Sequence, residues 1–439
     1  MSALKNRFIP TCLVVFGFLA APLTPAWAVD IQTVTSQKGV KALLAEDYTV
    51  PLIAISFSFK GGATQDEPGK EGTAKLLTNM LDEGAGELKS QAFQEALDEN
   101  GMNYSFSAGY DSFSGSIKTV VDFAPRSYEL LRLMLTKPLF DDEPLARMKA
   151  SRLSGLKRAQ SNPRAIAGKA FREAIFAEHP YGRPVNGTME SMQAQQAEDL
   201  RQFHSRVFAR DNLVIGVVGA ISPDDLKTVL DQIFGDLPEK SQLKDVPEIA
   251  IETGKEVHVE FNTPQTNIRL VQPGIKRDDP DFFAAYLVNY VLGGGSFSSR
   301  LYDEVREKRG LAYGVYSYLD PYDHAGVIGS GTATRTERTD QALEVILEEI
   351  EKMGREGPTA EELEKAKKYI TGSYAIANLD TSGKIAGVLV AIQQADLGLD
   401  YIDKRAEYIA NVTLDDAKRV AKDLFSAKPT VITVGRKAN

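Results

Sequence analysis

The sequence is poor in the residues that form disulfides and metal sites. It has one cysteine and four histidines among 439 residues. Cys12 lies in the N-terminal leader described below, so the mature chain would have no thiol, which excludes disulfides and cysteine ligands. No two histidines have the spacing of metal ligands, and we expect surface or helix-capping roles for them: His179, His204, His258 and His324.

Positive charge is also scarce. Lysine and arginine number 51 against 60 aspartates and glutamates, which gives a formal net charge of −9. No basic stripe is present, so the chain does not belong to the nucleic-acid-binding class. No low-complexity tract predicts disorder. The mature chain of about 410 residues is too long for one compact core, so two or more domains are expected.

Long apolar runs are limited to the N-terminus. Lys5 and Arg7 precede an apolar run from Phe8 to Pro22, and the small-residue pattern Ala26-Trp27-Ala28 follows. This order is typical of a secretory signal peptide, here residues 1–28. The run is shorter than the roughly 20 residues that span a bilayer, so we expect no membrane anchor after cleavage. Cleavage would leave 49 basic and 60 acidic residues, and an exported, cysteine-free chain fits the bacterial periplasm.

The mature sequence contains one pattern of elements twice. Residues 50–60 (VPLIAISFSFK) predict a strand, followed by a polar loop and a helix over 73–83. Residues 265–274 (QTNIRLVQPG) predict a second strand, followed by a loop and a helix over 282–292. Residues 197–219 and 414–435 both contain an acidic helix start, a phenylalanine near the helix end and an apolar strand. A repeat of about 200 residues indicates duplicated domains.

The expected domains follow from this repeat. An N-terminal domain covers 29–240, a linker with interrupted periodicity covers 241–256, and a C-terminal domain covers 257–439. Strand patterns (102–121 and 326–334) and helix patterns (144–160 and 359–376) come in runs rather than in strict alternation. Runs of this kind predict an α+β fold, with helices packed on mainly antiparallel sheets.

The most specific stretch is GGGSFSSRLYDEVREKRGLAYGVYS, residues 293–317. It predicts a helix end, a flexible glycine turn, an N-cap at Ser298 or Ser299, a helix through Lys308, a stop at Gly310 and an aromatic strand. A phosphate-binding loop is excluded, because Gly-x4-Gly-Lys-Ser/Thr is absent and the glycines follow a helix rather than a strand.

This stretch resembles the signature of the C-terminal domain in the pitrilysin and insulinase family of zinc peptidases, which includes mitochondrial processing peptidase. The resemblance extends over the mature chain, since HPYGRPVNGT (179–188) and RDNLVIGVVG (210–219) also match. It implies two homologous domains that form a clam-like half-chamber. It also implies substrate capture by the glycine-rich segment, which is shorter here: Gly293, Gly294, Gly295, Ser296 and Phe297.

In that family an arginine and a tyrosine in Arg-x6-Tyr spacing reach toward the peptide bond. The matching residues are Arg306 and Tyr313. A water activated by zinc creates an oxyanion when it attacks a carbonyl, and hydrogen-bond donors near that charge lower the barrier. The alternative is a solvated helix arginine and a packed strand tyrosine.

The family's metal motif, His-x-x-Glu-His, is absent. The positions that match it within GTAKLLTNML (72–81) are Lys75, Thr78 and Asn79, and the position that matches the third ligand, a glutamate, is Gly155. Zinc binds imidazole, thiolate or carboxylate, whereas an ammonium repels it. We therefore interpret this polar strip as an abandoned metal site that faces a cavity, and expect no metal in this chain. A solvent-facing helix side is the alternative.

The resemblance supports a leading hypothesis: the chain is the non-catalytic subunit of an exported heterodimeric zinc endopeptidase. A homologous partner with His-x-x-Glu-His would supply zinc and the general base, while Arg306 and Tyr313 act in trans on peptide substrates. Alone, the chain would be inactive, and its self-association into a homodimer stays open.

Two other functions remain. The chain could be a peptide-binding or scaffold protein of the same fold, with the sheet edge at 103–116 capturing extended peptides. It could also be a peptidase by itself, although no Ser/His/Asp or Cys/His arrangement is visible.

Overall fold

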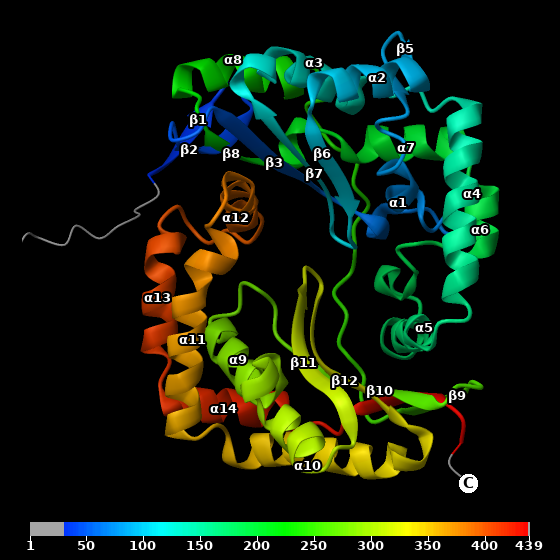
Figure 1. Cartoon of the computed structure of the whole chain (residues 1–439), viewed down its shortest axis with the longest axis vertical. Helices are drawn as coiled ribbons and strands as arrows, with labels where there is room; N and C mark the ends of the chain where they lie inside the picture. Colours follow the sequence, from blue (N-terminus) through cyan, green and yellow to red (C-terminus); the bar gives the residue numbers. More distant parts are fainter. Residues whose placement is uncertain (1–29, 438–439) are drawn as a thin grey trace, which may run out of the picture. The chain divides into compact units, whose positions relative to one another are not determined.

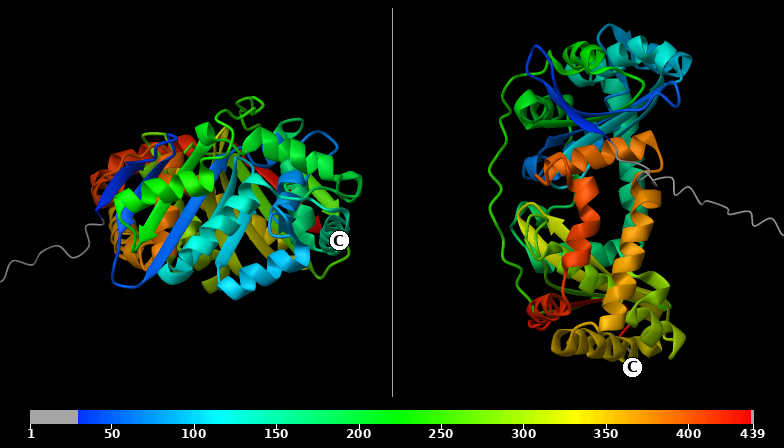
Figure 2. Two further views of the ribbon diagram at one scale, coloured as in Figure 1. Left: turned by 90° about the horizontal axis from the view of Figure 1, so that it is seen from above. Right: turned by 90° about the vertical axis from the view of Figure 1, so that its left-hand side faces the viewer.

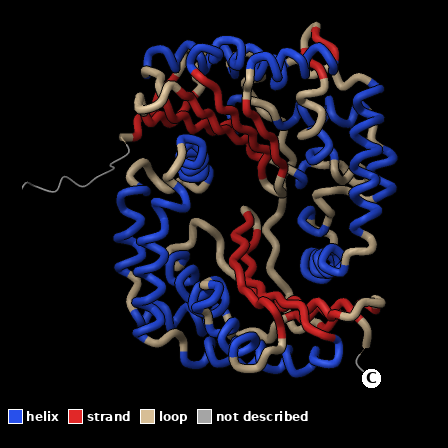
Figure 3. Tube along the Cα trace, viewed as in Figure 1, coloured by secondary structure: helices blue, strands red, loops and turns tan. Residues whose placement is uncertain are grey.

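The computed structural model describes residues 30–437, so the leader with Cys12 and the cleavage site lies outside the described residues. From Ile31 onward the chain forms one compact unit (Figure 1). Its described residues form two large sheets and one two-stranded sheet, and Figure 3 separates the strands from the surrounding helices. Within residues 30–437, no single helix is long and apolar enough to cross a bilayer, and one pair of helices bent by 116° passes that test by length and composition alone.

The two large sheets share one order of five strands, to which the first sheet adds β1 at its edge. The first has six strands in the order β1(Ile31–Thr35), β2(Lys41–Glu46), β8(Leu213–Gly219), β3(Leu52–Lys60), β7(Ser112–Val120) and β6(Asn103–Ala108). The second has five strands in the order β9(Glu256–Glu260), β13(Thr430–Gly435), β10(Gln265–Pro273), β12(Ala325–Arg335) and β11(Ala312–Tyr322). In each sheet only one pair is parallel, β2 with β8 and β9 with β13. The mainly antiparallel, duplicated α+β architecture is confirmed. The domain boundaries stay a prediction.

Each half also carries its own set of helices. The N-terminal half contains α1(Thr73–Leu77), α2(Ser90–Asn100), α3(Ala124–Thr136), α4(Asp142–Ala159), α5(Pro163–Phe176), α6(Met189–Ala194), α7(Ala197–Val207) and α8(Pro223–Phe234), with a short β4–β5 hairpin (Gly84–Ala85 and Leu88–Lys89). The C-terminal half contains α9(Phe282–Asn289), α10(Thr339–Glu356), α11(Ala360–Asn378), α12(Ser382–Gln394), α13(Tyr401–Asn411) and α14(Leu414–Leu424).

Alternation along the central strands builds two cores. Ile53, Ile55, Phe57 and Phe59 of β3 point to one face, where they pack with apolar residues of α1, α2, α3, α7 and α8. In β10, Ile268 and Leu270 point to the face that packs with α9, α10 and α14. Each half therefore has its own main core on one side of its sheet.

The second face of each sheet is covered by a helix from the other half. Helix α12 packs on β8 and β3, and α5 packs on β13, β10 and β9 (Figure 1). Gly216 allows the approach of α12, because a Cβ there would lie 2.3 Å from the carbonyl oxygen of Ala386. Gln394 Nε2 donates to Ser58 Oγ at 2.9 Å across this contact. We call this reciprocal arrangement of α5 and α12 the helix exchange.

The segment between the halves has no regular structure but is attached along its length. The turned view in Figure 2 shows it as a long green loop. Gln65 Nε2 donates to the carbonyl of Lys244 at 3.0 Å, and the amide of Lys244 donates back to Gln65 Oε1 at 2.8 Å. Further on, the amide of Ile249 donates to the carbonyl of His324 at 3.1 Å. The linker is thus part of the packed structure.

Two expected elements differ from the structure. The pattern over 102–121 is a hairpin of β6 and β7, and β7 is paired on both sides, so Ser116 is not on a sheet edge and the expected edge at 103–116 reduces to β6. The helix expected over 73–83 ends at Leu77, after which the chain continues in turns. The amides of Asn79 and Met80 donate to carbonyls three residues earlier, which tightens the winding.

Candidate functional site

Helix α1 is fixed at its start by Asp66. Gly72 has φ +93°, and its amide donates to Asp66 Oδ2 at 2.8 Å, while the amide of Ala74 donates to Oδ1 at 2.9 Å. Burial raises the pKa of Asp66 to about 7, although these two amides and the charge of Arg183 oppose the shift. This anchor sets the orientation of Lys75, which follows in the first turn of the helix.

The strip formed by Lys75, Thr78 and Asn79 is neither open to solvent nor part of the core. Lys75 and Asn79 are half-buried, and Thr78 is 8 % exposed. Thr78 Oγ1 donates to the carbonyl of Lys75 at 2.8 Å, so its hydroxyl closes the end of the helix. A fully solvent-facing helix side does not fit this burial.

Helix α4 packs beside α1 and adds a second positive charge. Arg152 Nη2 donates to Asn186 Oδ1 at 2.8 Å, and Arg152 Nε is buried without a hydrogen-bond partner among the described residues. Burial lowers the pKa of Lys75, and the charge of Arg152 lowers it further. One turn after Arg152, a Cβ on Gly155 would meet only the flexible end of Arg158, at 3.8 Å. Sequence reasoning missed Arg152, because its closeness to Lys75 follows from helix packing.

This arrangement does not suit a metal ion. Zinc needs neutral imidazole or carboxylate ligands, and the strip offers an ammonium, a hydroxyl and an amide. Within residues 30–437, no group of three or more His, Cys, Asp or Glu side chains could hold a metal ion. The residues present therefore do not fit the zinc of the family's motif.

Each histidine has a local partner. His179 Nδ1 accepts from the amide of Tyr181 at 3.1 Å and caps a short helical turn, as predicted. His204 Nε2 lies 2.8 Å from the carbonyl of Leu135. His258 contacts Thr433 at 2.9 Å, and His324 lies 3.3 Å from Glu248. His179 and His324 lie at the same place, beside Tyr181 and the linker residues Pro247 and Glu248, whereas His204 and His258 lie elsewhere.

In the C-terminal half, the glycines 293–295 continue from the end of α9, and Gly293 is buried whereas Gly294 is exposed. Helix α9 continues in a wider π-helical turn over Tyr290–Gly294. A Cβ on Gly293 would lie 2.5 Å from the amide nitrogen of Ser317, and one on Gly294 would lie 2.8 Å from Asn289 Nδ2. The helix end expected before these glycines is wrong, because the π-helical turn continues through Gly294, and Gly293 allows this segment to contact β11 closely. The flexibility of the segment stays a prediction.

The segment after these glycines exposes a phenylalanine. Ser296 has φ +47°, and Phe297 is 78 % exposed. The expected serine N-cap is also wrong: Ser298 Oγ donates to the carbonyl of Gly295 at 2.9 Å, and Ser299 Oγ donates to that of Ser296 at 2.8 Å. Both hydroxyls point back into the turn and leave the amides of the next helix without a side-chain cap.

Arg306 and Tyr313 come together in the structure. Arg306 lies in a π-helical segment, Tyr302–Glu307, and Tyr313 is the second residue of β11, where the pairing is irregular between Ala312 and Val315. The guanidinium carbon of Arg306 lies 5.0 Å from the centre of the Tyr313 ring, 4.7 Å from that of Tyr302 and 6.0 Å from that of Phe297. Tyr313 is 89 % exposed. The Arg306 cluster, as we call these four residues, thus holds an arginine among three aromatic rings.

The sequence predicted three members of this cluster and missed Tyr302. Tyr302 precedes Arg306 by one helical turn, a spacing that places two side chains on the same helix face. Among the described residues, no hydrogen bond, ion pair or ring contact joins the Arg306 cluster to Lys75 or Arg152. The two parts of the candidate site are therefore separate within one chain.

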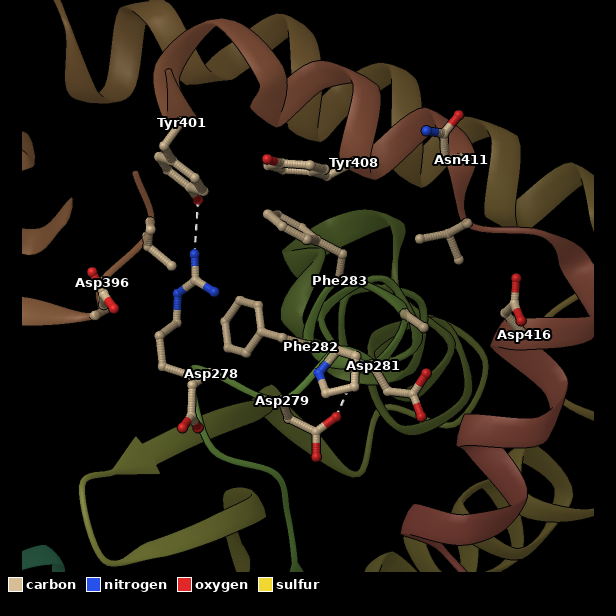
Figure 4. A pocket seen from close by; sticks show the side chains of 16 residues that line it. Asp278, Asp279, Asp281, Phe282, Phe283, Asp396, Tyr401, Tyr408, Asn411 and Asp416 are labelled. Carbon is tan, nitrogen blue, oxygen red and sulfur yellow. Dashed lines mark hydrogen bonds between the residues drawn. The ribbon is translucent and has the colours of Figure 1, made fainter. Parts of the chain in front are cut away.

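Two cavities lie elsewhere. One of about 920 Å³ is lined by both halves, including Ser58 of β3 and Gln393 of α12. The other, of about 680 Å³, lies between α9 and α13 (Figure 4). There Arg277 is 4.0 Å from the ring centre of Phe282 and donates to the hydroxyl of Tyr401 at 2.9 Å. Neither cavity is lined by Lys75 or Arg306.

Comparisons with known proteins identify the family. Residues 41–189 match the model of the insulinase family, peptidase family M16, and residues 195–370 match the model of the peptidase M16 inactive domain. An uncharacterized zinc protease, YmxG of Bacillus subtilis, is 28% identical over 81% of this chain and 86% of its own length. A non-peptidase homolog, YmxG of Helicobacter pylori, is 26% identical over 80% of this chain and 81% of its own.

A solved structure is similar throughout. The crystal structure of a peptidase M16 inactive domain from Pseudomonas fluorescens has a TM-score of 0.88 and 29% identity, and the match covers 93% of this chain and 98% of that one. The two family models together span most of the sequence, and the metal ligands of the motif are replaced. The chain belongs to the insulinase (M16) family of zinc metallopeptidases, as a member without the family's His-x-x-Glu-His motif.

Proposed function

We propose that this chain is the non-catalytic subunit of an exported two-chain zinc endopeptidase. Its partner would be a homologous chain that bears His-x-x-Glu-His. The observation that supports this most is the Arg306 cluster, in which an exposed tyrosine and an arginine lie 5.0 Å apart in a chain whose own metal positions are a lysine, a threonine, an asparagine and a glycine. A leader peptide typical of secreted proteins supports export to the periplasm.

In the assembled enzyme the partner's zinc would activate the attacking water. Arg306 offers a planar fork of N–H donors suited to a peptide carbonyl, and Tyr313 offers a phenolic O–H. Because Tyr313 is exposed, its O–H can reach a substrate held by another chain. When the carbonyl oxygen gains charge, Tyr313 would donate to it while Arg306 holds the neighbouring peptide unit. A donor of this kind contributes about 10²–10³ in kcat.

The segment from Gly293 to Phe297 would line the substrate path. Gly293, Gly294 and Gly295 set the backbone, and Ser296 and Phe297 follow on the surface. Phe297 is exposed and packs edge-on against Tyr302, with ring centres 4.9 Å apart. An apolar side chain of the substrate would contact this ring.

The test compares the isolated chain with its complex. The partner is obtained by pull-down of the endogenous protein, and the metal content of the complex is measured. The isolated chain with added zinc should not cleave unfolded peptides, whereas the complex should. Tyr313→Phe should lower kcat of the complex by about 10²–10³ with little change in KM. Tyr316→Phe, an exposed tyrosine of the same strand, is the matched control and should change neither. Cleavage by the isolated chain that survives Arg306→Ala would disprove the proposal.

A second candidate function is peptide binding without cleavage. The observation that favours it is β6, an edge strand whose outer residues Asn103, Ser105 and Ser107 are exposed. Such an edge can pair with an extended peptide through its main chain. In that case Tyr313→Phe would leave function largely intact.

A further inference from the structure

The cations around α1 differ in what neutralises them. Lys70 Nζ lies 2.7 Å from Asp199 Oδ2, and Arg147 Nη2 lies 2.6 Å from Glu83 Oε2. Lys75 lies in α1 and Arg152 lies in α4. Neither side chain has a carboxylate oxygen within 4.0 Å among residues 30–437. The neutral Asn186 is the side chain that Arg152 contacts. Two neighbouring positive charges are thus left without a counter-ion.

These two charges are held in an unfavourable place. Both side chains are half-buried, and burial lowers the pKa of each. The charge of Arg152 lowers the pKa of Lys75 further, and no carboxylate opposes it. Like charges in a partly desolvated site cost folding free energy. Uncompensated groups of this kind occur preferentially at functional sites.

The site also has unused hydrogen-bonding capacity. Arg152 Nε is buried with no partner among the described residues, and Lys75 Nζ donates to none of them. The absence of a side chain on Gly155 leaves the α4 face open, since a Cβ there would meet only Arg158 Nη2, at 3.8 Å. Asn79, which follows Lys75 by four residues and is half-buried, adds a side-chain amide to the strip.

We propose that Lys75 and Arg152 form an oxyanion-binding site at the position of the lost metal ligands, and that its ligand is the C-terminal carboxylate of a peptide. Both side chains would donate charge-assisted hydrogen bonds to the two carboxylate oxygens. The inference rests on the proposed function, because that function supplies the peptides. Free phosphate has the same chemistry and is the other source of such an anion.

The experiment measures binding to the full-length isolated chain. A short unstructured peptide with a fluorescent N-terminal label is prepared with a free C-terminal carboxylate and with a C-terminal amide. Anisotropy should show that the wild-type chain binds the acid about tenfold more tightly than the amide. Lys75→Met and Arg152→Met should remove this preference. Lys157→Met, the same charge change on an exposed lysine of α4, should retain it.

Three other outcomes would overturn the oxyanion site or assign it to free phosphate. Equal affinity for acid and amide, with no effect of inorganic phosphate on thermal stability, would overturn the proposal. Stabilisation by phosphate that disappears in a folded Lys75→Met chain, without acid preference, would keep the oxyanion site and assign it to free phosphate. Stabilisation by phosphate that persists in Lys75→Met and Arg152→Met would overturn it.

The result is separable from the proposed function. An active complex whose isolated subunit shows no acid preference would reject only the oxyanion site. An acid preference in a chain that never yields an active complex would reject only the role as peptidase subunit. Circular dichroism melts of all variants confirm that they are folded before the affinities are compared.

Discussion

The helix after the long loop is polar in one half and apolar in the other. Counted from the helix start, Lys75 and Thr78 of the α1 region correspond to Ala284 and Leu287 of α9. Both α9 residues are buried in the C-terminal core. The two copies occupy the same place in the same topology, so the fold itself does not require polarity there. The strip around Lys75 is therefore better explained by chemistry than by packing.

Adding a charge to α9 should change the free energy of unfolding more than removing the charge from α1. Ala284→Lys places an ammonium at a site that is 4 % exposed and has no partner, and should cost about 3–5 kcal/mol of unfolding free energy. Lys75→Ala removes a half-buried charge and adds a good helix former, and should change stability by less than about 1 kcal/mol. Urea denaturation followed by circular dichroism measures both. Equal losses would mean that the α1 copy is as dependent on packing as α9.

A buried carboxylate in the N-terminal half should make stability fall as pH rises. Burial raises the pKa of Asp66 to about 7 in the folded chain, against 3.8 ordinarily. The folded state therefore binds this proton more tightly than the unfolded state. The resulting contribution to the free energy of unfolding is fully present below pH 3.8 and is lost as pH rises through 7. Between pH 4 and 7, wild type should lose up to about 4 kcal/mol relative to Asp66→Asn. A constant difference would contradict this.

A carboxylate in the C-terminal half should act with the opposite sign. Burial alone would raise the pKa of Glu362, but two hydrogen bonds from Arg300, at 2.6 and 2.7 Å, lower it to about 2. Its stabilisation is present above pH 4.5 and lost as pH falls through about 2. The stability difference between wild type and Glu362→Gln should shrink by about 1–3 kcal/mol over that window. An unchanged difference would show that this ion pair does not stabilise the fold.

Glycines of the two halves should respond differently to alanine. Gly293→Ala forces a Cβ to within 2.5 Å of the Ser317 amide nitrogen and should cost about 1–3 kcal/mol. Gly155→Ala meets open space inside α4 and should stabilise the chain by about 0.4–1 kcal/mol. Thermal melts of both variants test the difference. A destabilised Gly155→Ala would mean that the α4 face is already occupied.

The duplicated fold could be predicted because its signals are local. Alternating apolar residues such as Ile53 and Phe57 define a strand, and their recurrence in β10 defines the second copy. The apolar side of α1 was also visible, with Leu76 and Met80 fully buried. Arg306 and Tyr313 were found through the resemblance of the surrounding stretch, since a spacing of seven residues does not by itself bring two side chains together.

The rest depends on contacts between distant segments. The apolar pattern of α12 predicts a buried helix but does not indicate which sheet covers it, because periodicity contains no information about the partner. The charge of Arg152 beside Lys75 depends on how α1 and α4 pack. The π-helical winding that carries Arg306 has no composition signature, and it brings Tyr302 and Tyr313 to the same guanidinium.

The helix exchange has a consequence for how the chain is made. Strand β8 ends at Gly219, whereas α12, which covers it, begins at Ser382. During synthesis the first sheet would wait, with one face bare, until nearly the whole polypeptide has emerged. Contacts between segments this distant in sequence form slowly and leave aggregation-prone intermediates. Chaperone dependence during biogenesis, and two fragments that stay together after a protease cuts between them, would be natural properties of such an interlocked chain.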